Sequence, residues 1–173
     1  RSFYDKDLTL TSNFQSTKNI LDSISKYSKD TIFFFPSSCN IYEGYKNQLV
    51  DEQTTPKPLS SYAKSKFAVS EYIENSLEQN ELNINTGILF SHESEFRRKN
   101  FFSKFIIEHL IDFKFNNKEA IKVGNLDIKR DIGYAKEYVE AIYKINTYNL
   151  KESFIVSSNE LYTLNLFVET AML

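Results

Sequence analysis

The sequence predicts an α/β fold with a mostly parallel sheet and helices on both faces. Segments with apolar residues at helical spacing alternate with short apolar runs along the chain. The short runs are continuously apolar, which is typical of strands covered on both faces. Glycine (4) and proline (3) are few for 173 residues, while phenylalanine (15) and tyrosine (11) are numerous. This composition favours regular elements with aromatic packing over disorder.

The first half of the chain contains two predicted helices and two predicted strands. Residues 13–28 have apolar side chains at helical spacing, and residues 32–35 form a continuous apolar run that predicts a buried strand. Ser60 is a predicted N-cap of the next helix. The apolar face of that helix carries Phe67, Ala68, Val69, Tyr72 and Ile73. Residues 84–90 predict a second buried strand.

The second half continues the alternation. Phe102, Phe105, Ile106, Leu110 and Phe113 lie on one face of a predicted amphipathic helix. The remaining predicted elements are a strand over 120–123, a helix around 138–145, a strand over 154–157 and a helix over 163–171. The length of 173 residues fits a single α/β domain. The polar segment 42–58 is the longest predicted loop, at a strand end where ligands of such sheets bind.

Bulk composition excludes several functions. The net charge of −2 provides no field to recruit nucleic acid or an anionic membrane. No apolar run is long enough for a membrane span, and we expect no signal peptide. The only cysteine, Cys39, excludes an internal disulfide and a multi-cysteine zinc site, so we expect no metal and a reducing, cytoplasmic location.

One pair of motifs indicates chemistry. Ser37-Ser38 follows the first predicted strand, and Tyr62 lies four residues before Lys66 on the next helix. Residues i and i+4 share a helix face, so the Lys66 ammonium is expected beside the Tyr62 phenol. A nearby cation lowers the pKa of a phenol and favours its use as a proton acceptor. The alternative is an ordinary packing pair on a helix.

Three further stretches resemble one family. They are TGILFSHES over 86–94, GNLDIKRDIG over 124–133, and YVEA over 138–141. With the two motifs above, the chain resembles the GDP-mannose 4,6-dehydratase branch of the extended short-chain dehydrogenase/reductase family, from Ser2 to about Ala171. The resemblance implies a partial Rossmann-type, doubly wound sheet, with residues of about 91–130 contributing to the substrate-binding region.

The resemblance implies catalytic roles at the first two motifs. Tyr62 would take the proton from the C4 hydroxyl of the sugar while hydride leaves for NADP. Lys66 would lower the pKa of Tyr62, and both residues would contact NADP. Ser38 would hydrogen-bond the same sugar hydroxyl.

The resemblance also implies binding residues. His92 and Arg97 match positions that contact NADP, with Arg97 placed for phosphate. Ser91, Lys104 and Arg130 match substrate-binding positions, and the planar guanidinium of Arg130 suits a nucleotide diphosphate. A nucleotide sugar is therefore the expected partner, and a homo-oligomer is a further possibility.

Other interpretations exist for three of these residues. His92 at a strand end is able to cap backbone groups instead. Arg97 belongs to a basic stretch that also suits a solvated turn. Arg130 is next to Asp131, with which it would form a structural ion pair.

The chain departs from the family at its general base. The family's glutamate, which removes the C5 proton, falls at Asn40, and an amide is not a base at ordinary pH. Glu43 and Cys39 are the nearby candidates to replace it. Ser91 also differs, because the branch has an asparagine there. A related epimerase or reductase, which needs no such glutamate, and a non-catalytic homologue or binding module are therefore alternatives to a dehydratase.

The chain also lacks the family's G-x-x-G-x-x-G stretch. Its glycines at 44, 87, 124 and 133 are too scattered to cradle a pyrophosphate. The resemblance therefore suggests a fragment of a larger enzyme. We expect the 173-residue chain alone to bind NADP weakly or not at all. Titration calorimetry tests this expectation, and a submicromolar affinity would contradict it.

Overall fold

The computed structural model describes residues 6–45, 48–80 and 82–173. The chain divides into two compact units. Unit 1 comprises residues 1–89 and 139–156, and unit 2 comprises residues 90–138 and 157–173. The sequence suggests one domain, with the stretch of about 91–130 contributing to substrate binding, and the whole of that stretch lies in unit 2.

Unit 1 contains a parallel three-stranded sheet. Its strands are β1 (Ile32–Ser38), β2 (Asn83–Leu89) and β5 (Ser153–Val156), in the order β1-β2-β5. The first two strands are paired along their whole length, with Ser38 opposite Leu89 at the carboxyl end. The strands predicted over 32–35 and 84–90 are therefore adjacent, with β2 in the middle of the sheet and β1 at its edge.

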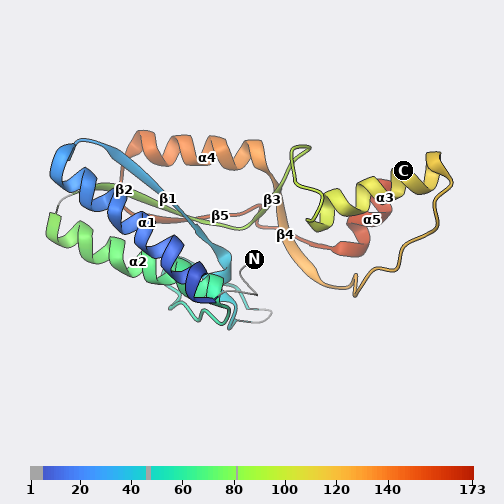
Figure 1. Cartoon of the computed structure of the whole chain (residues 1–173), viewed down its shortest axis with the longest axis horizontal. Helices are drawn as coiled ribbons and strands as arrows, with labels where there is room; N and C mark the ends of the chain where they lie inside the picture. The colour runs from blue at the N-terminus through green and yellow to red at the C-terminus, as the bar shows by residue number, and fades with distance from the viewer. Residues whose placement is uncertain (1–5, 46–47, 81) are drawn as a thin grey trace. The chain divides into compact units, whose positions relative to one another are not determined.

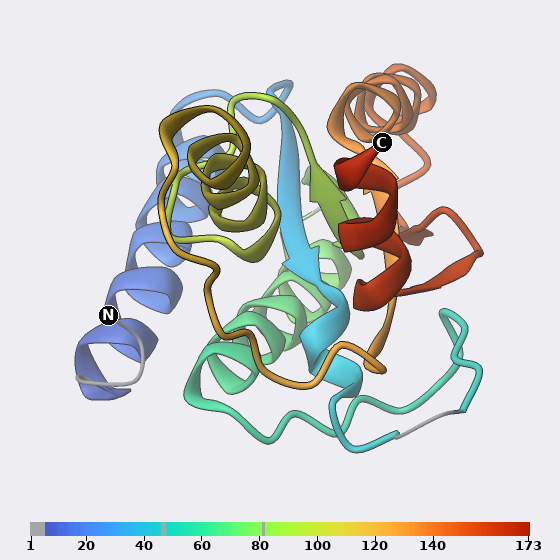
Figure 2. The same ribbon diagram turned by 90° about the vertical axis from the view of Figure 1, so that its right-hand side faces the viewer.

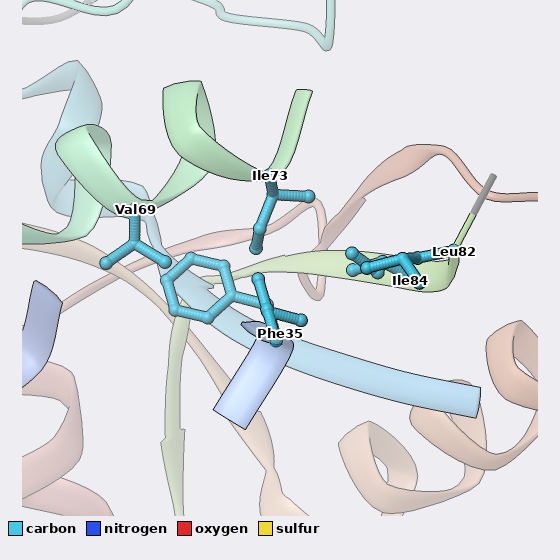
Figure 3. Packing of buried hydrophobic residues seen from close by; sticks show 6 residues of the cluster. Phe35, Val69, Ile73, Leu82 and Ile84 are labelled. Atoms are coloured by element: carbon cyan, nitrogen blue, oxygen red, sulfur yellow. The ribbon is translucent and has the colours of Figure 1, made fainter. Parts of the chain in front are cut away.

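Helices cover both faces of this sheet (Figure 1). Helices α1 (Lys6–Tyr27) and α2 (Ser61–Asn80) pack together on one face, and α4 (Ala135–Tyr148) lies on the other from Val139 onward. Val69 and Ile73, two residues of the apolar face predicted for the second helix, lie in the core under α1 and α2. Its buried members are Leu21, Phe35, Val69, Ile73, Leu82 and Ile84, most of which Figure 3 labels.

The chain leaves the sheet at β1 through a tight turn. The strand leads directly into the 3₁₀ helix η1 (Cys39–Tyr42), and the loop that follows leads to α2 (Figure 2). Ser60 caps α2 as predicted, since its Oγ accepts a hydrogen bond from the Ala63 N–H at 3.1 Å. These two turns place the end of β1 and the start of α2 at the same edge of the sheet.

A buried asparagine fixes the turn between α4 and β5. The Asn85 side chain is fully enclosed, and its Nδ2 donates to Asn146 Oδ1 (3.3 Å) and Asn149 Oδ1 (3.1 Å). Its Oδ1 accepts from the Lys151 N–H at 3.0 Å. Asn149 and Lys151 have positive φ angles of 46° and 59°. The side chain therefore satisfies a turn whose backbone is in the left-handed region.

Replacing Asn85 with alanine is expected to lower the free energy of unfolding by about 1–3 kcal/mol, because a buried N–H and two side-chain oxygens lose their partner. Urea denaturation of the 173-residue chain measures this loss. The matched control is Asn100→Ala at an exposed position, which is expected to change stability by less than about 0.5 kcal/mol. Equal stability of the two variants would show that the network is dispensable.

Unit 2 is built from short elements. Strand β4 (Lys129–Tyr134) pairs in parallel with β3 (Ser91–Glu93) and antiparallel with β6 (Leu161–Thr163). Helices α3 (Phe102–Asn116) and α5 (Leu164–Met172) complete the unit. The strand predicted over 120–123 is wrong. That segment has no regular structure, and Ile121 and Val123 are 37% and 38% exposed, so no partner strand covers them.

Two kinds of feature are absent from the part of the chain that the structure describes. In residues 6–45, 48–80 and 82–173, no helix has the length and apolar character needed to cross a membrane. Within the same ranges, no three His, Cys, Asp or Glu side chains gather in an arrangement able to hold a metal ion.

Candidate functional site

The carboxyl end of β1 presents the first group of candidate residues. Ser38 is the last residue of the strand and the N-cap of η1, and its Oγ accepts from the Asn40 N–H at 3.3 Å. A serine suits this position because its hydroxyl satisfies a free amide at a helix start. The same hydroxyl is directed to the edge where ligands of parallel sheets bind.

Tyr62 meets Ser38 at this edge. Tyr62 is the second residue of α2 and is partly buried, and its phenol is close enough to the Ser38 hydroxyl for the two side chains to interact. Burial raises the pKa of Tyr62 above its usual value of 10, while the hydrogen bond from Ser38 lowers it and the nearby Cys39 thiol raises it. The balance is upward, so the lowering expected from Lys66 is not found in this arrangement.

Lys66 lies near the Tyr62 ring, but its ammonium is hydrogen-bonded to the backbone of β1. Its Nζ donates to the Pro36 carbonyl oxygen at 2.7 Å and lies 6.0 Å from the centroid of the Tyr62 ring. Burial lowers the pKa of Lys66. Helical spacing therefore places both side chains on one face as predicted, and β1 holds the ammonium close to the strand end.

The turn after Ser38 carries the other candidates of unit 1. Asn40 belongs to η1, and its Oδ1 accepts from the Cys39 Sγ at a sulfur distance of 3.7 Å. The Glu43 carboxylate accepts hydrogen bonds from the Leu59 N–H and from Ser60. Sequence reasoning missed this contact, because no local pattern links Glu43 to residues 16 and 17 positions away.

The second group of candidates lies in unit 2. Ser91 and His92 belong to β3, and His92 Nδ1 lies 2.8 Å from the Phe90 carbonyl oxygen. The His92 ring packs on Tyr138, with centroids 4.8 Å apart. Gly133 allows this packing, since a Cβ there would lie 2.4 Å from Tyr138 Cε2. The last glycine of GNLDIKRDIG thus has a packing role.

Arg97 is held on two sides. Its Nε lies 3.1 Å from Glu93 Oε2, and its Cζ lies 3.8 Å from the centroid of the Phe101 ring. Glu93 Oε2 also accepts from the Ser103 hydroxyl at 2.6 Å. The buried Arg97 Nε–H has no well-aligned acceptor among the described residues. The guanidinium is therefore oriented by ion pairing and stacking, with hydrogen-bonding capacity left for an anion.

A hollow of about 370 Å³ lies beside this guanidinium within unit 2. It is lined by His92, Ser94, Phe96, Arg97, Arg98, Phe101 and Ala135. Two guanidinium groups and an imidazole thus border one concave surface. The larger hollow of unit 1, about 440 Å³, is lined by none of Ser38, Asn40, Tyr62 and Lys66.

The remaining substrate-binding candidates have different environments. Lys104 Nζ donates to the Glu95 carbonyl oxygen at 3.3 Å. Arg130 is exposed on β4, opposite Tyr162 of β6. Asp131 is 9% exposed, and its carboxylate instead accepts from the backbone and hydroxyl of Ser158 and from the Asn159 N–H. The partners found for Asp131 therefore favour a turn-anchoring role over an ion pair with Arg130.

The structure thus brings the candidates together in two sets. Ser38, Asn40, Tyr62 and Lys66 meet at the end of β1 in unit 1. Ser91, His92 and Arg97 lie on or next to β3 in unit 2, with Lys104 at the start of α3. The first set offers a phenol, a hydroxyl and an ammonium for proton transfer. The second offers cations for an anionic ligand.

Comparison with known proteins gives the same family from a sequence model and from individual relatives. The sequence model of the family described as GDP-mannose 4,6 dehydratase matches residues 1–173. The GDP-mannose 4,6 dehydratase of Homo sapiens is 31% identical over 159 residues, covering 91% of this chain and 43% of the relative. The enzyme of Vibrio cholerae is 28% identical over 171 residues, covering 97% of this chain and 46% of the relative. The chain thus spans less than half the length of these relatives.

Solved structures share the fold. RMD from Pseudomonas aeruginosa, complexed with NADPH, superposes with a TM-score of 0.91 at 19% identity, covering 97% of this chain and 59% of that chain. The dTDP-glucose 4,6-dehydratase of Bacillus anthracis, in complex with NAD, gives a TM-score of 0.86 at 16% identity, with coverages of 97% and 53%. These likenesses support the Rossmann-like α/β fold.

Proposed function

Because this chain belongs to the GDP-mannose 4,6 dehydratase family, we propose that it forms part of an NADP-dependent nucleotide-sugar dehydratase acting on GDP-mannose. One observation carries the proposal. The Tyr62 phenol interacts with the Ser38 side chain at the carboxyl end of a parallel strand, and the Lys66 ammonium lies 6.0 Å from the centroid of the Tyr62 ring. The relatives named GDP-mannose 4,6 dehydratase supply the substrate class.

The proposed chemistry begins at the sugar C4 hydroxyl. Tyr62 accepts the proton of this hydroxyl, and Ser38 holds the same oxygen through a hydrogen bond. NADP, when bound, accepts the hydride from C4. Since burial raises the pKa of Tyr62, the phenol is protonated at neutral pH in this arrangement. Proton transfer therefore depends on stabilising the phenolate, for which the Lys66 ammonium is the nearby cation.

The residues of unit 2 fit a phosphate-bearing cofactor. Arg97, whose Nε lies 3.1 Å from Glu93 Oε2, lines the hollow with His92 and Arg98. This donor set suits an anion, so Arg97 and His92 would hold NADP together with Tyr62 and Lys66. One neighbouring structure contains NADPH and another NAD. The choice of NADP rests on the phosphate-binding capacity of Arg97.

The remaining candidates are assigned to the substrate. The exposed Arg130 suits a nucleotide diphosphate, because a guanidinium binds such oxygens in pairs. Ser91 and Lys104 complete the proposed substrate-binding set.

Asn40 favours a second candidate function. Since its amide is not a general base, a nucleotide-sugar epimerase or reductase, which needs only Ser38, Tyr62 and Lys66, fits the catalytic turn equally well. A non-catalytic homologue that binds a nucleotide sugar is the third candidate.

Product analysis separates these candidates. The complete gene product that contains residues 1–173 is incubated with NADP and GDP-mannose, and the sugar nucleotide is analysed by mass spectrometry and NMR. Loss of one water with a keto group at C4 supports the dehydratase. Inversion of a sugar hydroxyl without loss of water supports an epimerase, and a reductase is tested in a separate incubation with NADPH and a keto sugar nucleotide. Binding without any conversion supports the third and contradicts the proposed enzymatic function.

A further inference from the structure

We propose that Glu43 is a positioning residue that holds the Tyr62 helix against the Ser38 turn. The inference rests on the proposed function, because the role assigned to Tyr62 gives the positioning its consequence. It differs from the sequence-based alternative in which Glu43 replaces the missing general base.

The Glu43 carboxylate binds the start of α2. Its Oε2 accepts from the Leu59 N–H at 3.2 Å and the Ser60 N–H at 2.7 Å, and its Oε1 accepts from Ser60 Oγ at 2.9 Å. Ser60 Oγ in turn accepts from the Ala63 N–H at 3.1 Å. Helix N-termini have amides without intrahelical partners and a positive dipole end. A carboxylate there fixes the helix start two residues before Tyr62.

The other end of Glu43 is fixed to the catalytic turn. Its N–H donates to the Asn40 carbonyl oxygen at 3.0 Å, which closes η1, and the Asn40 N–H donates to Ser38 Oγ at 3.3 Å. The loop is joined to the same turn, because the Lys57 N–H donates to the Ile41 carbonyl oxygen at 2.8 Å. A continuous set of hydrogen bonds therefore links Ser38 to the helix that carries Tyr62.

These contacts argue against a base role for Glu43. Movement of the carboxylate toward a sugar would remove the acceptor of two backbone amides and one hydroxyl. The Ser60 N–H and hydroxyl are partly buried, so leaving them without an acceptor is unfavourable. The same contacts make the carboxylate a strong anchor, since hydrogen bonds to a charged group are stronger than neutral ones.

Two substitutions separate anchoring from acid–base chemistry. Glu43→Gln keeps an acceptor oxygen for the two amides and an NH₂ group that donates to Ser60 Oγ, but it has no titratable group. Glu43→Ala removes every contact. Glu71→Ala, at an exposed position on α2, is the control. For each variant of the complete gene product, kcat and KM for GDP-mannose are measured with NADP.

A positioning role predicts a specific pattern. Glu43→Ala is expected to lower kcat by about 10- to 100-fold with little change in KM, because a displacement of about 1 Å has an effect of that size. Glu43→Gln is expected to restore kcat to within about threefold of the parent. If Gln is as damaging as Ala, Glu43 acts in acid–base chemistry and the proposal is wrong. It is also wrong if Ala has no effect.

A second measurement does not depend on activity. In the 173-residue chain with ¹³Cζ-labelled tyrosine, NMR titration follows Tyr62, and hydrogen exchange follows the amides of Leu59 and Ser60. Glu43→Ala is expected to speed exchange at both amides about tenfold or more and to change the Tyr62 pKa, whereas Glu43→Gln leaves both near the parent values. An unchanged Tyr62 titration in Glu43→Ala overturns the inference. If no variant shows turnover while these signals change as expected, the proposed function fails and the anchoring role holds.

Discussion

Replacing Tyr62 with phenylalanine is expected to lower kcat/KM for oxidation of the sugar C4 hydroxyl by roughly 10²- to 10⁴-fold, the usual effect of removing a general base. The ring and its packing remain, and only the phenol oxygen, which interacts with the Ser38 side chain, is lost. The measurement is the appearance of enzyme-bound NADPH absorbance in a single turnover with GDP-mannose, because complete dehydration regenerates NADP, and it uses the complete gene product that contains residues 1–173.

The pH dependence of kcat/KM is a second test of Tyr62 as the proton acceptor. Because the pKa of Tyr62 is raised, the phenolate fraction is small at neutral pH and grows as pH rises toward that pKa. The parent protein is therefore expected to show log(kcat/KM) rising with pH between about 7 and 9, and Tyr62→Phe is expected to lose this rise. A flat profile in the parent would argue that another group accepts the proton.

A neighbouring tyrosine supplies the matched control. Tyr72 lies on the same helix, and its hydroxyl donates to Asp22 Oδ1 at 2.9 Å rather than to Ser38. Tyr72→Phe likewise removes one phenol oxygen from α2, so it is expected to change kcat/KM less than about threefold. Equal losses in both variants would indicate general damage to α2.

The sequence predicted unit 1 well for a physical reason. Helices cover both faces of the sheet of β1, β2 and β5, which favours apolar residues in these strands, and helices α1 and α2 present an apolar stripe to it. Ser38 and Tyr62 could be placed together because a strand end and a helix start at one sheet edge are brought together by topology. The parallel pairing of β1 with β2 has the same origin.

The strands of unit 2 could not be predicted in the same way. The residues of β3 (Ser-His-Glu) and of β6 (Leu-Tyr-Thr) form three-residue strands, too short for any periodicity. Strand β4 begins Lys-Arg-Asp and is fixed by backbone pairing to both neighbours and by the buried Asp131 carboxylate. Conversely, the apolar run over 120–123 has no partner strand among the described residues. Non-local hydrogen bonds, which sequence periodicity does not encode, decide these cases.

The hydrogen-bond partners and the burial of the site residues could not be predicted from the sequence either. Helical spacing predicted that Lys66 lies near Tyr62, but the destination of its ammonium, the Pro36 carbonyl, depends on how α2 sits against β1. The degree of burial, which raises the Tyr62 pKa, is likewise a tertiary property. The His92 Nδ1 contact with the Phe90 carbonyl matches the backbone-capping interpretation, and the His92 ring also lines the hollow of unit 2.

Replacing Asn40 with glutamate is expected to raise the rate of water elimination by about 10²- to 10⁴-fold, because dehydration needs a base for the C5 proton and the amide provides none. Asn40 occupies the second position of η1, next to the turn that positions Ser38. A carboxylate at this position would keep the contact with the Cys39 thiol, which donates to the present Asn40 oxygen. Its negative charge would also raise the pKa of the nearby Tyr62 further, so the C4 oxidation step is expected to slow modestly.

The assay for Asn40→Glu distinguishes oxidation at C4 from the elimination of water. Formation of the 4-keto-6-deoxy sugar is followed by mass loss of one water and by deuterium incorporation from solvent, in an assay with GDP-mannose and NADP. Asn40→Gln is the matched control, because glutamine has the size of glutamate without its basicity, and it is expected to leave elimination slow. If the parent already dehydrates rapidly and Asn40→Glu changes nothing, the base lies at another residue. If neither form converts any nucleotide sugar although both bind one, the non-catalytic interpretation replaces the dehydratase, since a restored carboxylate then has no oxidised intermediate to act on.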